Sequence, residues 1–185
     1  MTDPREEFRE LESADELGGV RDGFQRLWTP HRMAYIAAGA EVNRGSGCPF
    51  CAAPEKSDAD GLIVYRGTHA YALMNLFPYN AGHMLICPYR HVGVYDEASP
   101  EEIDEISRIT QTAMRVMRTA SGCHGFNIGM NQGEVAGAGV EEHLHQHIVP
   151  RWRSDANFLP IIGRTKALPQ LLGDVRQALA DAWPA

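Results

Sequence analysis

Three histidines in the last quarter of the chain alternate with other residues in the string HLHQHIV. Because the side chains of a β-strand alternate between its two faces, this spacing predicts that His143, His145 and His147 project from one face of a strand over residues 143–149. A buried imidazole needs partners for both ring nitrogens, so packing alone explains three such rings poorly. The spacing therefore predicts a functional groove lined by imidazoles.

A glycine-rich loop, GEVAGAG over residues 133–139, precedes the histidines. Backbone amides in such a loop can approach and cradle an anion because no Cβ obstructs them. Taken alone, this loop is a weak signal. Next to three alternating histidines it indicates a phosphate group held against an imidazole nucleophile.

A second candidate site is the pair Cys48 and Cys51, in the string CPFC. This spacing lets two thiolates bind one ion, but a closed structural zinc site needs four ligands. A metal-free reduced pair and a thiol redox pair are the alternatives. The redox pair is expected beside a thioredoxin-like βαβ pattern, which this sequence does not show.

The elements that must position these residues have the pattern of an antiparallel sheet. Short runs rich in β-branched and aromatic residues, separated by turn-forming residues, predict strands within LIVYRG (62–67), AYALMN (70–75) and HMLICP (83–88). The run GFNIGMN (125–131) predicts a further strand before the one at residues 143–149.

A helix after residue 99 carries clear signals at both ends. Ser99 is the predicted N-cap, Pro100 the first helical residue, Glu102 the partner in a capping box and Gly122 the stop. A second helical apolar repeat lies between residues 169 and 183. The predicted fold class is α+β, an antiparallel sheet of about five strands with one main helix packed on it.

Length and composition narrow the class of protein. A chain of 185 residues, 44% of them hydrophobic, predicts one globular domain. With 24 acidic against 17 basic residues the net charge is -7, which argues against nucleic acid as a partner. No apolar run approaches the roughly 18 residues of a membrane span, and no secretory signal is visible. Four cysteines without such a signal indicate a reducing compartment, and the cytoplasm is the expected location.

The predicted domain boundaries follow a change in composition. Residues 1–23 are acidic and poor in aromatics, which predicts an N-terminal extension. The aromatic-rich string FQRLWTPHRMAY begins at residue 24, so we expect a single domain over residues 24–185.

The string HLHQHIVPRW resembles the signature of the histidine triad (HIT) superfamily. The strings NLFPYNAGHMLICPYRH and NIGMNQGEVAGAG extend the resemblance over residues 32–153, and it is strongest to the bacterial branch that includes diadenosine tetraphosphate phosphorylases. The resemblance implies a HIT-like fold, with the N-terminal extension and a helix near residues 167–183 outside the family core. It also implies an enzyme that cleaves an adenine dinucleoside polyphosphate at the α-phosphate through a nucleotidyl-histidine intermediate.

The resemblance assigns roles to individual residues. His145 matches the nucleophile, and His147 matches a donor to the phosphate oxygens. The other positions matching nucleotide or phosphate contacts are Asn75, His83, Asn131, Gly139 and Val140. Asn75 would bind ribose hydroxyls, and His83 would support the active-site backbone or orient the region of the nucleophile. Gly139 stands where the family often has Ser or Thr, so a hydroxyl commonly directed at the leaving group is absent.

The resemblance also completes the cysteine site. Many bacterial members combine a CxFC pair with a histidine after the third strand and with the first histidine of the triad. These positions are Cys48, Cys51, His91 and His143 here, and the implied cofactor is a structural Zn²⁺ with no organic cofactor. His143 would then bind metal and brace the strand that presents His145.

Several functional alternatives stay open at this point. The acceptor of the nucleotidyl group is either phosphate or water, which distinguishes a phosphorylase from a hydrolase. The other candidates are a nucleoside phosphoramidate hydrolase, a nucleotide-binding module with little turnover and a zinc-stabilised interaction module. Family members commonly form two-fold dimers, so the expected assembly is a homodimer.

Overall fold

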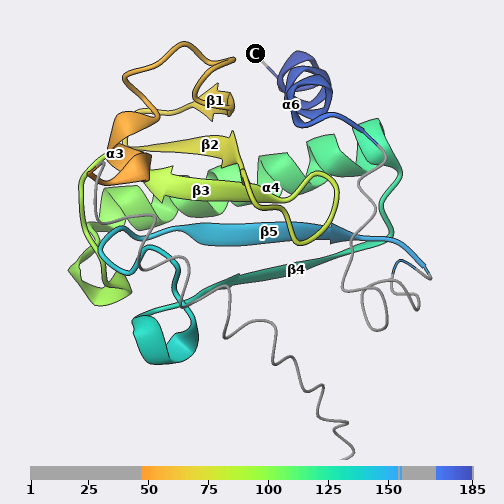
Figure 1. The fold of residues 1–185 in the computed structure, drawn as a ribbon. Coiled ribbons are helices and arrows are strands. Elements are labelled where there is room, and N and C mark those ends of the chain that lie inside the picture. Colours follow the sequence, from red (N-terminus) through yellow and green to blue (C-terminus); the bar gives the residue numbers. More distant parts are fainter. Residues whose placement is uncertain (1–46, 154, 156–169, 185) are drawn as a thin grey trace, which may run out of the picture. The chain divides into compact units, whose positions relative to one another are not determined.

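The fold is built on a five-stranded antiparallel sheet, seen in a computed structural model that describes residues 47–153, 155 and 170–184. Along the sheet the order is β1-β2-β3-β5-β4. The strands are β1 (Ile63–Arg66), β2 (Ala70–Met74), β3 (Met84–Pro88), β4 (Gly125–Met130) and β5 (Gln146–Arg151). The helices are α3 (Pro49–Ala52), α4 (Pro100–Ser121) and α6 (Leu172–Asp181), with 3-10 turns η2 (Tyr95–Glu97) and η3 (Glu134–Ala136) (Figure 1). The predicted α+β class is confirmed.

The main helix α4 begins and ends where the sequence predicts. The Ser99 Oγ accepts a hydrogen bond from the backbone N–H of Glu102, and the Glu102 carboxylate accepts one from the backbone N–H of Ser99, at 2.7 Å. Gly122 ends the helix in the left-handed conformation, with φ 61°. Such caps satisfy backbone groups that a helix end leaves without intrahelical partners.

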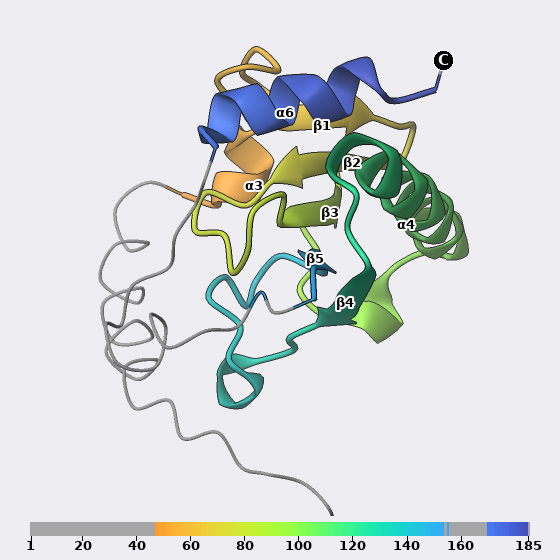
Figure 2. The ribbon, with the colours of Figure 1, turned by 90° about the vertical axis from the view of Figure 1, so that its right-hand side faces the viewer.

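Two apolar clusters cover the opposite faces of the sheet. The larger cluster joins α4 to residues such as Ala72, Ile86 and Ile148. The smaller one lies on the other face and joins Tyr71 and Leu85 to Phe50 of α3, together with further residues of β1 to β3. Figure 2 shows α3 and α4 on opposite sides of the sheet. The chemistry predicted above lies on the α3 side.

The predicted strand over residues 143–149 is wrong at both ends. The Leu144 backbone N–H donates to Val92 O at 2.6 Å, so this part of the chain pairs with the segment after β3 and joins no strand ladder. The strand starts at Gln146 and continues through Pro150 to Arg151. A proline has no backbone N–H to donate, but β5 tolerates Pro150 because β3 pairs only with residues 146–148. No carbonyl of β3 therefore lacks a donor opposite Pro150.

The predicted loop around the cysteine pair contains the short helix α3. Cys48 precedes it and Pro49 is its first residue, which suits a proline because that position needs no N–H partner. The Tyr71 hydroxyl donates to Phe50 O at 2.5 Å and thereby ties α3 to β2. Burial raises the pKa of Tyr71, so this donor keeps its proton.

The predicted C-terminal helix is present as α6, which packs beside β1 (Figures 1 and 2). The buried Arg176 donates to Ile63 O at 2.9 Å, and Trp183 stacks on Tyr65 with ring centroids 5.0 Å apart. Among the described helices, none is both long and apolar enough to cross a membrane. The expected N-terminal extension (1–23) and the start of the domain at residue 24 lie outside the described residues and stay predictions.

Candidate functional site

His145 lies just before β5, and its ring is fixed by the main chain. The ring Nδ1 lies 2.7 Å from the carbonyl oxygen of His143. Since a carbonyl only accepts hydrogen bonds, Nδ1 carries the proton and donates it. In the neutral ring, Nε2 therefore keeps its lone pair.

Burial keeps the His145 ring neutral. The residue is 6% exposed, and desolvation lowers the pKa of its imidazole more than the bond to His143 O raises it. The Phe50 ring lies against it, with centroids 4.9 Å apart. A neutral imidazole with a lone pair on Nε2 has the form that a nucleophile needs.

His147, the first triad residue inside β5, forms a chain of hydrogen bonds with His83. The His83 Nδ1 accepts from the Tyr79 backbone N–H at 3.0 Å. The proton of neutral His83 is therefore on Nε2, which lies 2.9 Å from the Nδ1 of His147. His147 accepts that bond, so its own proton is on Nε2. The Tyr79 N–H, acting through His83, thus makes the Nε2 of His147 a hydrogen-bond donor. In His145 the corresponding ring atom, Nε2, carries a lone pair instead.

Asn75, at the end of β2, organises the turn beside these rings. Its Oδ1 accepts from the Phe77 backbone N–H at 3.0 Å, and its Nδ2 lies 3.3 Å from the Nδ1 of His83. The amide therefore supports the same His83 tautomer as Tyr79 does. Its assignment to ribose binding stays a prediction.

The three histidines do not line one groove, which corrects the expectation from their spacing. The ring centroids of His145 and His147 are 5.1 Å apart, and these two form one site. The His143 ring belongs instead to the cysteine cluster, with its Nδ1 3.3 Å from the Cys48 Sγ. The cause is the backbone before Gln146, which is not in a strand and so does not follow the two-residue alternation.

The loop between β4 and β5 carries the other predicted phosphate contacts. Asn131 follows Met130, which pairs with Gln146, so Asn131 and His145 lie at the same end of the β4–β5 ladder. Gly139 and Val140 lie in the bend after η3, and Val140 packs against the cluster that contains Phe50. Gly133 and Gly137 flank η3 with φ 76° and 83°, a conformation that favours glycine. The phosphate contacts themselves stay predictions.

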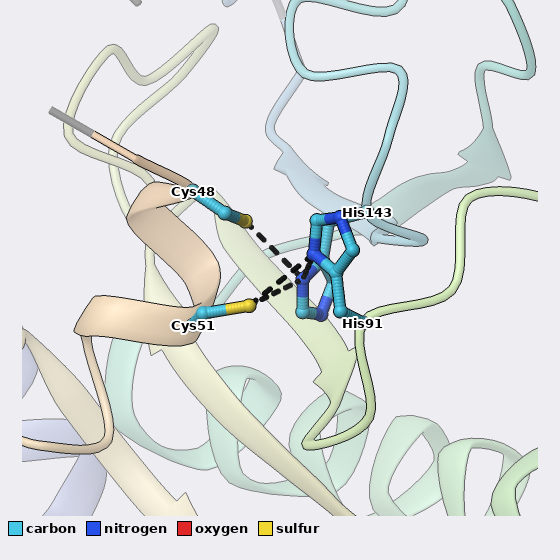
Figure 3. A group of neighbouring side chains, drawn as sticks. All are labelled: Cys48, Cys51, His91 and His143. Atoms are coloured by element: carbon cyan, nitrogen blue, oxygen red, sulfur yellow. Dashed lines mark hydrogen bonds between the residues drawn. The ribbon is translucent and has the colours of Figure 1, made fainter. Parts of the chain in front are cut away.

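The four predicted metal ligands form one cluster (Figure 3). Ligand atoms of Cys48, Cys51, His91 and His143 all lie within 4.8 Å of one another. The Nδ1 of His143 is 3.3 Å from the Nδ1 of His91 and 3.5 Å from the Cys51 Sγ. The Cys51 Sγ is also 3.3 Å from the His91 Nδ1. These residues come from α3, from the segment after β3 and from the segment before β5.

The donor set and its spacing fit a tetrahedral ion. Ordinary Zn–N and Zn–S bond lengths place nitrogens about 3.3 Å apart, and nitrogen about 3.6 Å from sulfur, on a tetrahedron. The Nε2 of His143 lies 2.9 Å from Pro88 O and donates to it, which leaves the lone pair of Nδ1 directed at the cluster. Arg90, next to His91, binds the Glu102 carboxylate at 3.0 and 2.8 Å and so fixes that segment to the start of α4.

Two residues of the site escape sequence reasoning. Phe50 stands inside the cysteine motif, but nothing in its type or position indicates that it packs on His145. Tyr79 sits among turn-forming residues, yet its ring lies on His147, with centroids 5.6 Å apart and 14° between the planes. Both contacts join segments distant in sequence, so no local periodicity reports them.

Comparisons with known proteins show what the chain is similar to. The HIT domain family matches residues 56–154. A Mycobacterium tuberculosis protein named AP-4-A phosphorylase is 48% identical over 171 residues, covering 89% of this chain and 87% of that protein.

Solved structures share the fold. A Zn-bound histidine triad family protein from Mycobacterium smegmatis has a TM-score of 0.60 at 23% identity, covering 74% of this chain and 92% of the other. A hypothetical histidine triad nucleotide-binding protein from Sulfolobus tokodaii has a TM-score of 0.60 at 25% identity, covering 73% and 91%. Since the family match spans more than half of the chain and the mycobacterial protein aligns with nearly all of it, the chain belongs to the HIT family.

Proposed function

We propose that the chain cleaves adenine dinucleoside polyphosphates, such as diadenosine tetraphosphate (Ap4A), by transferring a nucleotidyl group to His145. The observation that carries this proposal is the His145 ring, buried and neutral, with Nδ1 held by His143 O and a lone pair left on Nε2. The naming of the 48% identical M. tuberculosis protein as AP-4-A phosphorylase supports the choice of substrate.

In the proposed reaction, His145 Nε2 attacks the α-phosphorus of Ap4A. A P–N bond to AMP forms, the P–O bond to the rest of the molecule breaks, and ATP leaves. The ring becomes positively charged in the adduct, and its Nδ1 proton stays on the bond to His143 O. That carbonyl stabilises the cation in a site from which water is largely excluded.

His147 acts as the donor in this step. Its Nε2 proton, placed there by His83, lies on the ring next to the nucleophile and can bond to a phosphate oxygen as charge develops. Asn131 and the backbone amides near Gly139 and Val140 are the proposed further phosphate contacts. Asn75 is the proposed ribose contact.

The second step returns the histidine to its free form. Inorganic phosphate attacks the adduct at phosphorus, the P–N bond breaks and ADP forms. Water in place of phosphate would give AMP. The name of the M. tuberculosis relative favours phosphate as the acceptor.

The proposed metal at the four-residue cluster is Zn²⁺, which suits a Cys2His2 set of donors in tetrahedral arrangement. When bound, the ion supplies rigidity, because all four positions are filled by protein and none is open for substrate. His143 then holds in place the carbonyl that orients His145. Phe50, within α3, is held against the same ring.

Product analysis tests the reaction. Purified protein and its His145→Ala variant are incubated with Ap4A, with and without phosphate, and AMP, ADP and ATP are resolved. We expect ADP and ATP only with phosphate, and neither from the variant. AMP with ATP would identify a hydrolase. The absence of products from the wild-type chain would contradict the proposal and direct the search to phosphoramidates or to a binding role.

The proposed assembly is a homodimer built on β4. This strand ends the sheet, and its Ile128 is 45% exposed. An edge strand offers unpaired backbone groups to a second copy, and a two-fold axis would make one continuous sheet. Light scattering should give about twice the chain mass of 20.4 kDa. A mass equal to one chain would contradict the dimer.

A further inference from the structure

Asn80 joins the turn between β2 and β3 to the end of β5. Its Nδ2 donates to Pro150 O at 3.1 Å and to the Oδ2 of Asp155 at 2.9 Å. A carbonyl and an ionised carboxylate only accept hydrogen bonds, so these two partners fix the orientation of the amide. The other amide atom, Oδ1, accepts from the backbone N–H of Ala81 at 3.2 Å. Each polar atom of this side chain thus contributes to holding the turn.

Asp155 is a charged and well-fixed partner for Asn80. Its carboxylate accepts from the Nε of Arg151 at 2.6 Å, from the Nη2 of Arg151 at 2.8 Å and from the backbone N–H of Trp152 at 3.2 Å. The bond to Arg151 above all, together with those to Trp152 and Asn80, lowers the pKa of Asp155 to about 2. The group is therefore ionised at neutral pH, and a hydrogen bond to a charged acceptor is stronger than one between neutral groups.

The same turn selects the tautomer of His83. The His83 backbone N–H donates to Asn80 O at 3.1 Å, and the Tyr79 backbone N–H donates to the His83 Nδ1 at 3.0 Å. If the turn changed shape and the Tyr79 N–H left Nδ1, His83 could carry its proton there, and its Nε2 would become an acceptor. His147 would then donate from its Nδ1 and lose the proton on Nε2. The Asn75 Nδ2, at 3.3 Å, is the longer contact to the His83 Nδ1, so we expect such a change to mix the two tautomers.

We propose that Asn80 and Asp155 are positioning residues, which hold the turn so that His83 keeps the proton of His147 on Nε2. This inference rests on the proposed function, since that proton is the proposed donor to phosphate. The Asn80 side chain binds Pro150, which lies on the same strand as His147, so the turn is fixed relative to the ring that it serves. A Cβ at Gly82 would lie 3.3 Å from the Cγ of Pro150, which shows that the turn also packs closely on this part of β5.

Nitrogen NMR of the free protein, with isotope-labelled histidine and at a pH where the rings are neutral, tests the tautomer directly. A ring nitrogen that carries a proton and one that carries a lone pair give distinct signals, and those of His147 are identified by their absence in His147→Gln. The variants are Asn80→Ala, which removes the side chain that holds the turn, and Asp155→Asn, which keeps its shape and removes its charge. The matched control is Asn127→Ala, which removes only a 2.7 Å bond from the Nη1 of Arg151.

We expect the wild-type protein and Asn127→Ala to carry the His147 proton on Nε2, and both Asn80→Ala and Asp155→Asn to carry part of it on Nδ1. The His145 signal checks folding in the same spectrum, because His143 O holds its proton on Nδ1. If Asn80→Ala loses that signal, Asp155→Asn alone provides the answer. An unchanged His147 tautomer in the folded variants would overturn the proposal.

Labelled adduct formation from Ap4A tests the link to catalysis. Its rate should fall about ten-fold in Asn80→Ala, less in Asp155→Asn and less than about two-fold in Asn127→Ala. In a His147→Gln background, which has no ring tautomer, Asn80→Ala should cause no further loss. An equal loss in both backgrounds, or a changed tautomer with an unchanged rate, would overturn the positioning role and leave the proposed function intact. A wild-type protein that forms no adduct would overturn the proposed function, while the NMR comparison would still show whether Asn80 and Asp155 set the tautomer.

Discussion

His145 and His147 are the same residue type with opposite hydrogen-bonding character. The carbonyl of His143 forces a proton onto the Nδ1 of His145, and the N–H of His83 forces one off the Nδ1 of His147. One ring thus offers a lone pair at Nε2 and the other an N–H. The difference comes from their partners, which lie on the backbone before β5 and in the turn before β3.

This division of roles predicts different tolerance to glutamine, whose amide N–H can replace a ring donor but not a ring nucleophile. His147→Gln should keep adduct formation within about ten-fold of wild type, while His147→Ala should lose about 10²-fold to 10³-fold. His145→Gln should form no adduct. The measurement is labelled adduct formation from Ap4A after rapid quenching. Equal losses in the two His147 variants would show that donation from Nε2 is not its role.

At the scale of residues, the sequence identified what the site contains but not how its parts are oriented. The closeness of the four predicted metal ligands was expected from their types, spacing and family resemblance, and the structure brings them together. The even spacing of the triad suggested one shared face, whereas His143 turns toward Cys48. Tautomers could not be predicted, because each depends on one partner brought from a distant segment.

At the scale of the elements, helix α4 also stabilises a turn that lies outside the helix. Its Glu105 accepts hydrogen bonds from the backbone N–H groups of Thr68, His69 and Ala70, in the turn between β1 and β2. Burial raises the pKa of this carboxyl, but the three donors more than offset it, so the pKa lies below its ordinary value. A Cβ at Gly67 would lie 2.7 Å from the backbone oxygen of Ala70 and 2.8 Å from the Glu105 carboxylate, so the turn needs glycine at that point.

Replacing this carboxylate should therefore destabilise the sheet. Glu105→Gln turns an amide N–H₂ toward backbone donors and should lower the free energy of unfolding by about 1–3 kcal/mol. The control is Asp104→Asn, which breaks only an exposed pair with Arg108 and should cost less than about 0.5 kcal/mol. Urea unfolding monitored by circular dichroism measures both. Equal and small decreases in the free energy of unfolding of the two variants would show that water replaces the carboxylate at the turn.

Elements with local signals were predictable, and those set by tertiary contacts were not. The bounds of α4 follow from Ser99, Glu102 and Gly122, which act within one turn of the chain. The start of β5 depends on the bond from Leu144 to Val92, 52 positions earlier, which no local pattern contains. The link from Glu105 to residues 68–70 is of the same kind.

At the scale of the whole molecule, the four-residue cluster that is proposed to bind metal joins three segments that are distant in the chain. A bound ion stabilises the folded form because the unfolded chain does not hold these ligands together. A chelator should lower the melting temperature by roughly 10 °C and reduce Ap4A cleavage. Cys48→Ser should show the lower melting temperature without chelator and respond little to it.

Cys123→Ser is the matched control, since Cys123 is a buried free cysteine outside the cluster. It should keep about one zinc per chain by elemental analysis and respond to the chelator as the wild-type protein does. A purified wild-type protein without metal, equally stable with and without the chelator, would contradict the structural role of the ion.

The docking of α6 also governs how far the sheet can grow. The buried guanidinium of Arg176 donates a hydrogen bond to the carbonyl oxygen of Ile63, and the Trp183 ring stacks on Tyr65. Helix α6 therefore lies along the outer edge of β1, where a strand of another chain would otherwise pair. Of the two outer strands in the described sheet, only β4 then remains for a second copy. In the proposed dimer, pairing through β4 would use that position on both partners, so the assembly would close at two chains and would not propagate as a fibre.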